Sequence, residues 1–453
     1  MPVRELEWML ATRPPTRLSP IMSAPSAGSA AAQPPGPSEP FAVDVNAATL
    51  EYLRDGCERF GDVWCTPPVG EPGNKANAGD LPIWVLNDPA AIHEVLSRKQ
   101  TDFAKGIGFE RVKMLLGDGL IVSDGEHWKQ RRRMLQPAFA RPNIQSMTGM
   151  IQTCLQDRAA VWESHADSGQ PLDLSDESNR LGLRIILQAI FGEDLAQLDA
   201  RKGGNPFDLV VDTHTRDLMF AMRFRQLWPV VKEIVEARRQ RGGPPAQDFL
   251  GFYMAAEDRE TGAGLDMNGL VDEIMTLVVA GHETSAATIA WAWSLLARHP
   301  SAQDQLQSSP DRNDLALRIV HETLRLYPPV WMFTRKALHD GELAGFAMPA
   351  GSQILIAPYL LHRHPDHWNE PERFDPLRFP ASGQAPVRGA YIPFSSGPRR
   401  CAGDFFALQV VSQQILMVAE QYCVRPVRSE PPALDPAVNL RSRDPIQVLV
   451  SRC

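Results

Sequence analysis

Residues 394–403 constrain the fold most, because this segment, FSSGPRRCAG, carries one cysteine through a stiff turn to the start of a helix. The amides and the dipole at a helix N-terminus favour a thiolate at Cys401 over a thiol. Gly397 and Gly403 allow the backbone to approach a flat ligand closely, and Arg399 is placed to meet an anionic group at the edge of that ligand. The segment therefore predicts a cysteine ligand site. For a lone cysteine, a structural role at a helix start is the alternative.

Residues 272–298 are the second distinctive segment, an apolar helix pattern interrupted by AGHETS at residues 280–285. Glycine and β-branched threonine both weaken a helix, and a place where local preference fails is a candidate functional site. Gly281 would let a ligand lie against the helix backbone, Thr284 could donate a hydrogen bond to oxygen or to a water, and Glu283 could relay protons. The alternative is an ordinary helix whose hydroxyl groups bond back to carbonyls four residues earlier.

Together the two segments resemble the signatures of the cytochrome P450 family. Residues 394–403 match FxxGxRxCxG, and residues 280–285 match (A/G)Gx(D/E)T(T/S). The resemblance implies one large, mainly α fold with small β-sheets and haem b as cofactor. It further implies that Cys401 is the iron ligand and that Thr284 and Glu283 are catalytic residues that deliver protons. The haem contacts that it implies are Trp128, Arg132, Ala280, Gly281, Thr284, Arg335, Phe394, Gly397, Arg399, Cys401 and Gly403.

Two of these contacts, Trp128 and Arg132, can also be interpreted from the residues themselves. Trp128 and Arg132 form a WxxxR pattern at a predicted helix start, and a guanidinium group binds a carboxylate such as a haem propionate in a planar fork. Arg335 resembles the other propionate arginine of the family. The alternative for both arginines is a solvated surface position.

A scaffold network is also expected. Glu322 and Arg325 stand three residues apart on a predicted helix, so they can pair on one face. This ExxR pattern alone usually marks a solvated surface pair, but PERF follows at residues 371–374. By resemblance, Glu322, Arg325 and Arg373 form a buried network that locks the cysteine segment in place, and their role is structural.

Composition limits the remaining possibilities. The chain has 453 residues, 22% of them charged, and a formal net charge of −8, which argues against a general nucleic-acid binder. The sequence has no window that approaches the roughly 18 apolar residues of a membrane span. The cysteines other than Cys401 lack paired spacing and are expected to be thiols, as in a reducing cytoplasm. We expect a disordered leader at residues 1–33 and one haem domain at residues 34–453, in a cytoplasmic monomer.

The coarse pattern along the chain is helical. Residues 126–298 show helical spacing that glycine- and proline-rich loops interrupt, and two further helices are predicted at 315–326 and 402–421. Short strands are expected at 81–86 and between residues 331 and 358.

Substrate and partners follow from the resemblance. The family position of the pocket implies an apolar lining formed by Val278, Val279, Ala280, Val330, Trp331, Met332 and Phe333. This lining favours hydroxylation of a fatty-acid-like, terpenoid or polyketide-like substrate with dioxygen. The chain shows no flavin, nicotinamide or iron–sulfur motif, so a ferredoxin or flavodoxin with its NAD(P)H reductase is expected to supply electrons. Desaturation or coupling stays open. A haem sensor or a cofactor-free helical adaptor explains the interrupted helix less well.

Overall fold

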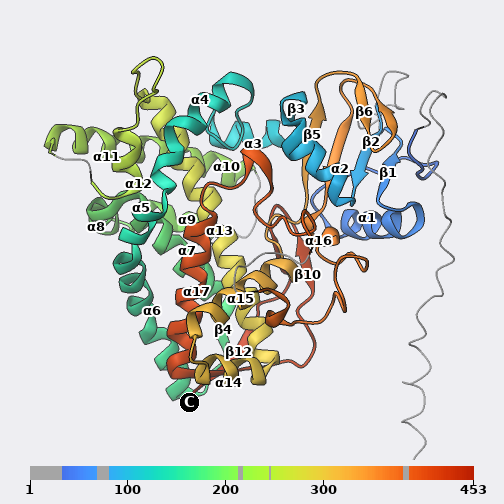
Figure 1. Cartoon of the computed structure of the whole chain (residues 1–453). Coiled ribbons are helices and arrows are strands. Elements are labelled where there is room, and N and C mark those ends of the chain that lie inside the picture. The colour runs from blue at the N-terminus through green and yellow to red at the C-terminus, as the bar shows by residue number, and fades with distance from the viewer. Residues whose placement is uncertain (1–32, 69–80, 213–217, 244–245, 381–386) are drawn as a thin grey trace, which may run out of the picture.

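The computed structural model describes residues 33–68, 81–212, 218–243, 246–380 and 387–453 (Figure 1). The leader expected at residues 1–33 lies outside the described residues, apart from its last residue. In the described part the chain is mainly helical with small β-sheets, which confirms the predicted fold class.

The longer helices carry most of the core. They are α1 (Ala47–Phe60), α4 (Gly125–Leu135), α6 (Thr148–Ser168), α7 (Leu174–Phe191), α11 (Leu227–Arg241), α13 (Met267–Arg298), α15 (Arg312–Leu326) and α17 (Asp404–Gln421). Shorter helices connect them: α2 (Pro89–His93), α3 (Phe109–Leu116), α5 (Arg141–Ser146), α8 (Leu195–Asp199), α9 (Leu209–Asp212), α10 (Leu218–Arg225), α12 (Phe249–Met254), α14 (Pro300–Ser308) and α16 (Pro358–Leu361).

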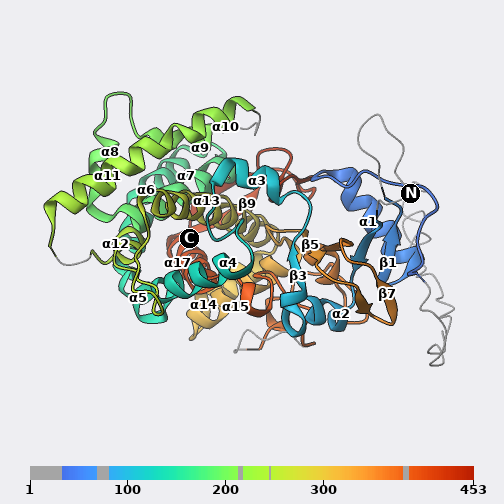
Figure 2. The same cartoon turned by 90° about the horizontal axis from the view of Figure 1, so that it is seen from above.

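Helix α13 runs through the middle of the helical part, with α7 and α17 packed against it (Figure 2). It begins at Met267 rather than at residue 272, because the Asp266 side chain caps the helix by accepting a hydrogen bond from Gly269 N at 2.8 Å. Apolar side chains on several faces of α13 are buried, which is the pattern of a helix enclosed by others.

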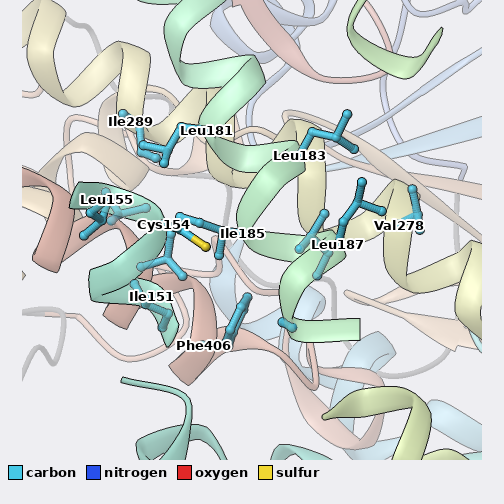
Figure 3. Packing of buried hydrophobic residues seen from close by; sticks show 14 of the residues in the cluster. Ile151, Cys154, Leu155, Leu181, Leu183, Ile185, Leu187, Val278, Ile289 and Phe406 are labelled. Atoms are coloured by element: carbon cyan, nitrogen blue, oxygen red, sulfur yellow. The ribbon is translucent and has the colours of Figure 1, made fainter. Parts of the chain in front are cut away.

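The packing between α6, α7, α13 and α17 is close and apolar (Figure 3). The side chains that show it are Ile151, Cys154, Leu155, Leu181, Leu183, Ile185, Leu187, Val278, Ile289 and Phe406, each at most 5% exposed. Gly281 lies where α7 and α13 pack closely. A Cβ atom there would lie 2.5 Å from Cδ1 of Ile186 on α7. The glycine in the interrupted helix therefore eases helix packing, and its expected role in ligand access stays a prediction.

The largest sheet of the described residues has the strand order β1-β2-β8-β5-β3 and lies beside the helical part (Figure 1). Its strands are β1 (Val63–Thr66), β2 (Ile83–Leu86), β3 (Phe103–Lys105), β5 (Phe333–Ala337) and β8 (Gln353–Ile356). The β2–β8 pair is parallel and the other pairs are antiparallel. Smaller sheets are formed by β4 (Leu172–Asp173) with β12 (Gln447–Arg452) and β9 (Tyr422–Pro426), by β6 (Gly341–Leu343) with β7 (Phe346–Met348), and by β10 (Leu434–Pro436) with β11 (Leu440–Ser442).

One expectation about cysteines is wrong. Cys423 and Cys453 form a disulfide with a Cα–Cα distance of 5.3 Å. Strand β9 carries Cys423, and the pairing of β9 with β12 brings the end of the chain beside it. Thirty residues separate the two cysteines, so only the tertiary pairing of the strands reveals the bond. Cys57, Cys65 and Cys154 are free, as predicted.

The Glu322–Arg325 pair forms the centre of a buried network. Arg325 donates from Nε to Glu322 Oε2 at 2.7 Å and from Nη2 to Glu322 Oε1 at 2.8 Å, and both side chains are 0% exposed. The same guanidinium donates to the carbonyl oxygens of His362, Pro371 and Arg373. A buried pair is stable only when its remaining donors and acceptors are also satisfied, and here backbone carbonyls satisfy them.

The predicted role of the Arg373 side chain is wrong. Its guanidinium is 61% exposed and pairs with Glu370 at 2.9 Å, so Arg373 joins the network only through its carbonyl oxygen. The second arginine at Glu322 is Arg378, whose Nε lies 3.4 Å from Glu322 Oε1 and whose side chain is 10% exposed. A local motif cannot distinguish these two arginines, because the path of the loop decides which one points inward.

This correction predicts unequal effects of two arginine substitutions. Arg378→Ala should lower the free energy of unfolding by about 1–3 kcal/mol, because a buried carboxylate loses a charged donor. Arg373→Ala, the matched control, should change it by less than about 0.5 kcal/mol, as an exposed substitution does. Urea unfolding of both haem-loaded variants would measure the difference, and equal losses would contradict the assignment.

Candidate functional site

The segment that carries Cys401 is held as a closed loop. A short 3-10 turn, η7 (Gly397–Arg399), precedes the cysteine, and α17 begins at Asp404. The Cys401 N–H donates to the Phe394 carbonyl at 2.9 Å, and Arg400 N donates to Gly397 O at 3.0 Å. Backbone hydrogen bonds therefore fix the position of the sulfur independently of any ligand.

The Cys401 side chain is exposed, although it stands at the start of a helix inside the fold. Burial nevertheless raises the pKa of its thiol above the ordinary value, and the Gly403 N–H and Arg132 oppose this effect only in part. The N–H at the helix start therefore favours the thiolate as expected, but burial outweighs it in the protein alone. A sulfur that is accessible but desolvated by the surrounding protein is suited to bind a metal ion directly, because metal coordination deprotonates a thiol outright.

A side chain would clash with the protein at position 397 but not at position 403. Gly397 has φ +71°, and a Cβ atom there would lie 1.9 Å from the carbonyl oxygen of Leu96, so close packing of η7 on this carbonyl demands glycine. At Gly403 a Cβ atom would come no closer than 3.6 Å, to Phe139. The loop thus needs Gly397 for its own fold, whatever it contributes to ligand binding.

The middle of α13 opens on one side only. Ala280, Glu283, Thr284 and Ala287 are partly exposed, whereas His282 is buried. Positions three and four apart share a helix face, so these accessible residues line one side of α13. Thr284 Oγ1 donates a hydrogen bond to Ala280 O at 2.7 Å. This is the bond to the carbonyl four residues earlier that an ordinary helix would show, the alternative given by the sequence. The Glu283 carboxylate accepts a hydrogen bond from Asn439 Nδ2 at 2.7 Å.

Several cations gather near Arg399. The Arg399 guanidinium lies over the Trp128 ring at 4.4 Å and pairs with Asp124 at 2.5 Å. Burial and the charge of Arg399 lower the pKa of Arg335 to about 10 and the pKa of Lys105 to about 7. Strand pairing sets Lys105 directly opposite Arg335, and no local sequence signal marked this lysine.

The cluster formed by Arg399, Arg335 and Lys105 carries more positive charge than the neighbouring protein carboxylates neutralise. Nε and Nη1 of Arg399 are buried and have no protein hydrogen-bond partner. Buried cations are unfavourable unless they are paired, so the cluster of Arg399, Arg335 and Lys105 suits a ligand with carboxylate groups. Arg132 lies apart from it, within electrostatic range of Cys401 and Asp404, and burial lowers its pKa.

The predicted substrate pocket is only partly accessible. Trp331 is 1% exposed and donates from Nε1 to Ala437 O at 2.8 Å, and Val278 is 0% exposed and faces the α7 packing (Figure 3). Both are core residues, so their assignment to the pocket is wrong. Of the remaining predicted residues, Val279, Ala280, Met332 and Phe333 are partly exposed and Val330 is exposed.

These residues carry the signatures of one family. Residues 75–450 match the family model described as Cytochrome P450. The chain belongs to the cytochrome P450 family. It is therefore a haem-dependent monooxygenase.

Known P450 enzymes resemble this chain over most of its length. Cyclooctat-9-en-7-ol 5-monooxygenase from Streptomyces melanosporofaciens is 32% identical, over 75% of this chain and 79% of its own length. Pentalenene oxygenase from Streptomyces avermitilis is 27% identical, over 77% and 83% respectively. The crystal structure of the cytochrome P450DA heme domain has the same fold, with a TM-score of 0.80, 24% identity, and coverage of 94% of this chain and 98% of that chain. Among the described residues of this P450, the helices include none that is long and apolar enough to cross a membrane.

Helix α13 also contains a buried acid whose protonation affects the loop beside the site. Glu273 is 1% exposed and accepts a hydrogen bond from Leu120 N at 3.1 Å. Burial raises its pKa to about 7, although the Leu120 N–H, Arg131 and Lys105 oppose this and Asp272 adds to it. Lys105 holds the same loop from the other side by donating to Leu120 O at 3.1 Å.

Glu273 should therefore make stability depend on pH. Because its folded pKa lies above its unfolded value, the native state binds the extra proton, and stability falls as the pH rises from about 4.5 through 7. Glu273→Gln should remove this loss and raise the free energy of unfolding at pH 8 by up to about 3 kcal/mol. The difference in free energy of unfolding between the variant and the wild type should shrink as the pH falls towards 4.5. Urea unfolding across this range would test it, with the exposed Glu126→Gln as control. A stability difference between variant and wild type that does not change with pH would contradict the prediction.

Proposed function

We propose that this P450 hydroxylates an apolar, terpenoid-like molecule with electrons from a separate ferredoxin or flavodoxin and its NAD(P)H reductase. The haem domain would comprise residues 34–453 of a cytoplasmic protein. One observation carries the proposal: an accessible sulfur at Cys401, an accessible helix face with Glu283 and Thr284, and unbalanced cations around Arg399 occur together in one fold. Terpenoids are favoured over fatty acids because the names of two relatives specify pentalenene and cyclooctat-9-en-7-ol.

Two groups of residues in this chain would hold the cofactor. Cys401 would ligate the iron, since its sulfur is accessible and its backbone is fixed by the Phe394 carbonyl. Arg399, Arg335 and Lys105 would pair with the propionates, which supply the negative charge that the cluster lacks. When bound, the haem supplies the activation of dioxygen and the oxidation of a C–H bond.

Helix α13 would supply protons and exclude water. The Thr284 hydroxyl donates its hydrogen bond to the Ala280 carbonyl oxygen in this structure, so it must rotate in order to donate elsewhere. Glu283 stands next to it and, being partly exposed, can exchange a proton with solvent. Ala280 and Ala287 make the same face small and apolar, so a hydrocarbon can lie against it without leaving buried polar groups unpaired.

The ligation is tested by optical spectroscopy. Reduced protein under carbon monoxide should show a strongly red-shifted Soret band, and Cys401→Ser should lose this band because an alcohol does not replace the thiolate. A Soret band at the position of histidine-ligated haem in the intact protein would overturn the assignment.

The role of Thr284 is tested against a matched residue. Thr284→Ala should lower product formed per NADPH by about 100-fold, the usual size of a lost proton-transfer group. Thr288 makes the same type of bond, to Thr284 O at 2.7 Å, but is 4% exposed, so Thr288→Ala should leave this ratio near the wild-type value. Equal losses in both variants would indicate a helix defect instead.

The substrate class is tested by binding. Pentalenene and cyclooctat-9-en-7-ol should shift the spin state of the ferric haem at lower concentrations than dodecanoic acid, because a carboxylate would lose its hydration at the apolar face of α13. Stronger binding of dodecanoic acid would favour a fatty-acid substrate instead.

A further inference from the structure

Asn439 makes a contact between two distant parts of the chain. It lies between β10 and β11, and its Nδ2 donates to Glu283 Oε2 at 2.7 Å across 156 residues of sequence. Both side chains are partly exposed, so the contact stands at the accessible face of α13 rather than in the core. An amide that donates to a carboxylate restricts the rotation of that carboxylate, and the charge strengthens the bond.

The backbone on both sides of Asn439 is anchored. Trp331 Nε1 donates to Ala437 O at 2.8 Å, and Trp291 Nε1, two turns beyond Glu283 on α13, donates to Leu440 O at 3.1 Å. Leu440 N also donates to Pro329 O at 2.8 Å, and the Leu440 side chain is 0% exposed. The Asn439 amide is therefore a donor at a fixed place, so it can hold Glu283 in one orientation.

An asparagine suits this position better than a charged donor. Its amide does not titrate, so it can orient the carboxylate without taking or giving a proton. A lysine or arginine there would hold the carboxylate as an ion pair and would oppose its protonation more strongly. The choice of a neutral donor fits a carboxylate that has to exchange protons.

We propose that Asn439 is the positioning residue for Glu283, which it holds in the orientation from which the carboxylate passes protons towards Thr284. This inference rests on the proposed function, because it assigns a partner to the proton-delivering acid. Asn439 itself contacts neither substrate nor cofactor in this role, and it acts only through Glu283. The Trp291 and Trp331 contacts make the β10–β11 hairpin the support for this orientation.

The isosteric Asn439→Asp variant separates this role from a merely structural one. It keeps the shape of the side chain but sets a second carboxylate against Glu283, so it should misplace the acid more than Asn439→Ala does. With an excess of a plant-type ferredoxin, its reductase and pentalenene, hydrogen peroxide released per NADPH should rise in the order wild type, Asn439→Ala, Asn439→Asp. Product formed per NADPH should fall about tenfold in Asn439→Ala, as for the loss of one bond to a charged group.

A hairpin control and an acid control complete the experiment. Arg441 pairs with Asp435 at 2.8 Å on the same hairpin and is 47% exposed, so Arg441→Ala should leave the peroxide ratio at the wild-type value. Glu283→Gln should raise this ratio. If it does not, the proposed role of Glu283 fails. If it does, but Asn439→Ala and Asn439→Asp match the wild type or fall in the reverse order, only the inference about Asn439 fails.

A measurement without turnover tests the contact itself. In a double-mutant cycle, Asn439→Ala should destabilise the wild type to urea more than it destabilises a Glu283→Ala background, because the second variant has already lost the bond. Additive effects would show that the two side chains are not coupled, and would overturn the inference whatever the enzyme oxidises.

Discussion

The buried Glu322–Arg325 pair is the interaction on which the cysteine loop depends. Arg325 donates to the His362 carbonyl at 3.0 Å, and the His362 ring in turn accepts a hydrogen bond from Ile392 N at 2.9 Å. Burial lowers the pKa of His362 to about 3, so its ring is neutral and can accept this bond. Ile392 leads directly into the loop that ends at Cys401. A charge pair on α15 thus fixes, through one carbonyl and one ring, the segment that carries Cys401, the proposed iron ligand.

Helix α13 combines two requirements that conflict in an isolated helix. It packs tightly on α7, where the absence of a side chain at Gly281 leaves room for Ile186. It also presents Glu283 and Thr284, the proposed proton-delivering residues, on an accessible face. Glycine and threonine weaken the helix locally, and burial of the apolar residues around them offsets this cost. The sequence pattern that looked locally unfavourable is explained by both requirements together.

Features that a short segment encodes could be predicted from the sequence, and features that long-range pairing decides could not. The cysteine loop, α13 and the mainly helical class belong to the first kind, with boundaries that a cap such as Asp266 shifts by a few residues. The second kind includes the pairing of Glu322 with Arg378 instead of Arg373, the burial of Trp331 and the Cys423–Cys453 bond. In each of these, the deciding neighbour is far away in the sequence or lies on a loop whose path no periodicity describes.

The cations around Arg399 connect folding with cofactor binding. Arg399, Arg335 and Lys105 have Asp124 as the carboxylate that interacts with all of them, and burial lowers the pKa values of Arg335 and Lys105. With a pKa of about 7, Lys105 is only partly charged at neutral pH in the protein alone. An anionic ligand favours the charged forms of both residues, so haem binding should draw a proton onto Lys105. The charged lysine would then hold the Leu120 carbonyl more firmly, because hydrogen bonds from charged donors are stronger. Bound haem would in this way strengthen a contact of the loop beside α13.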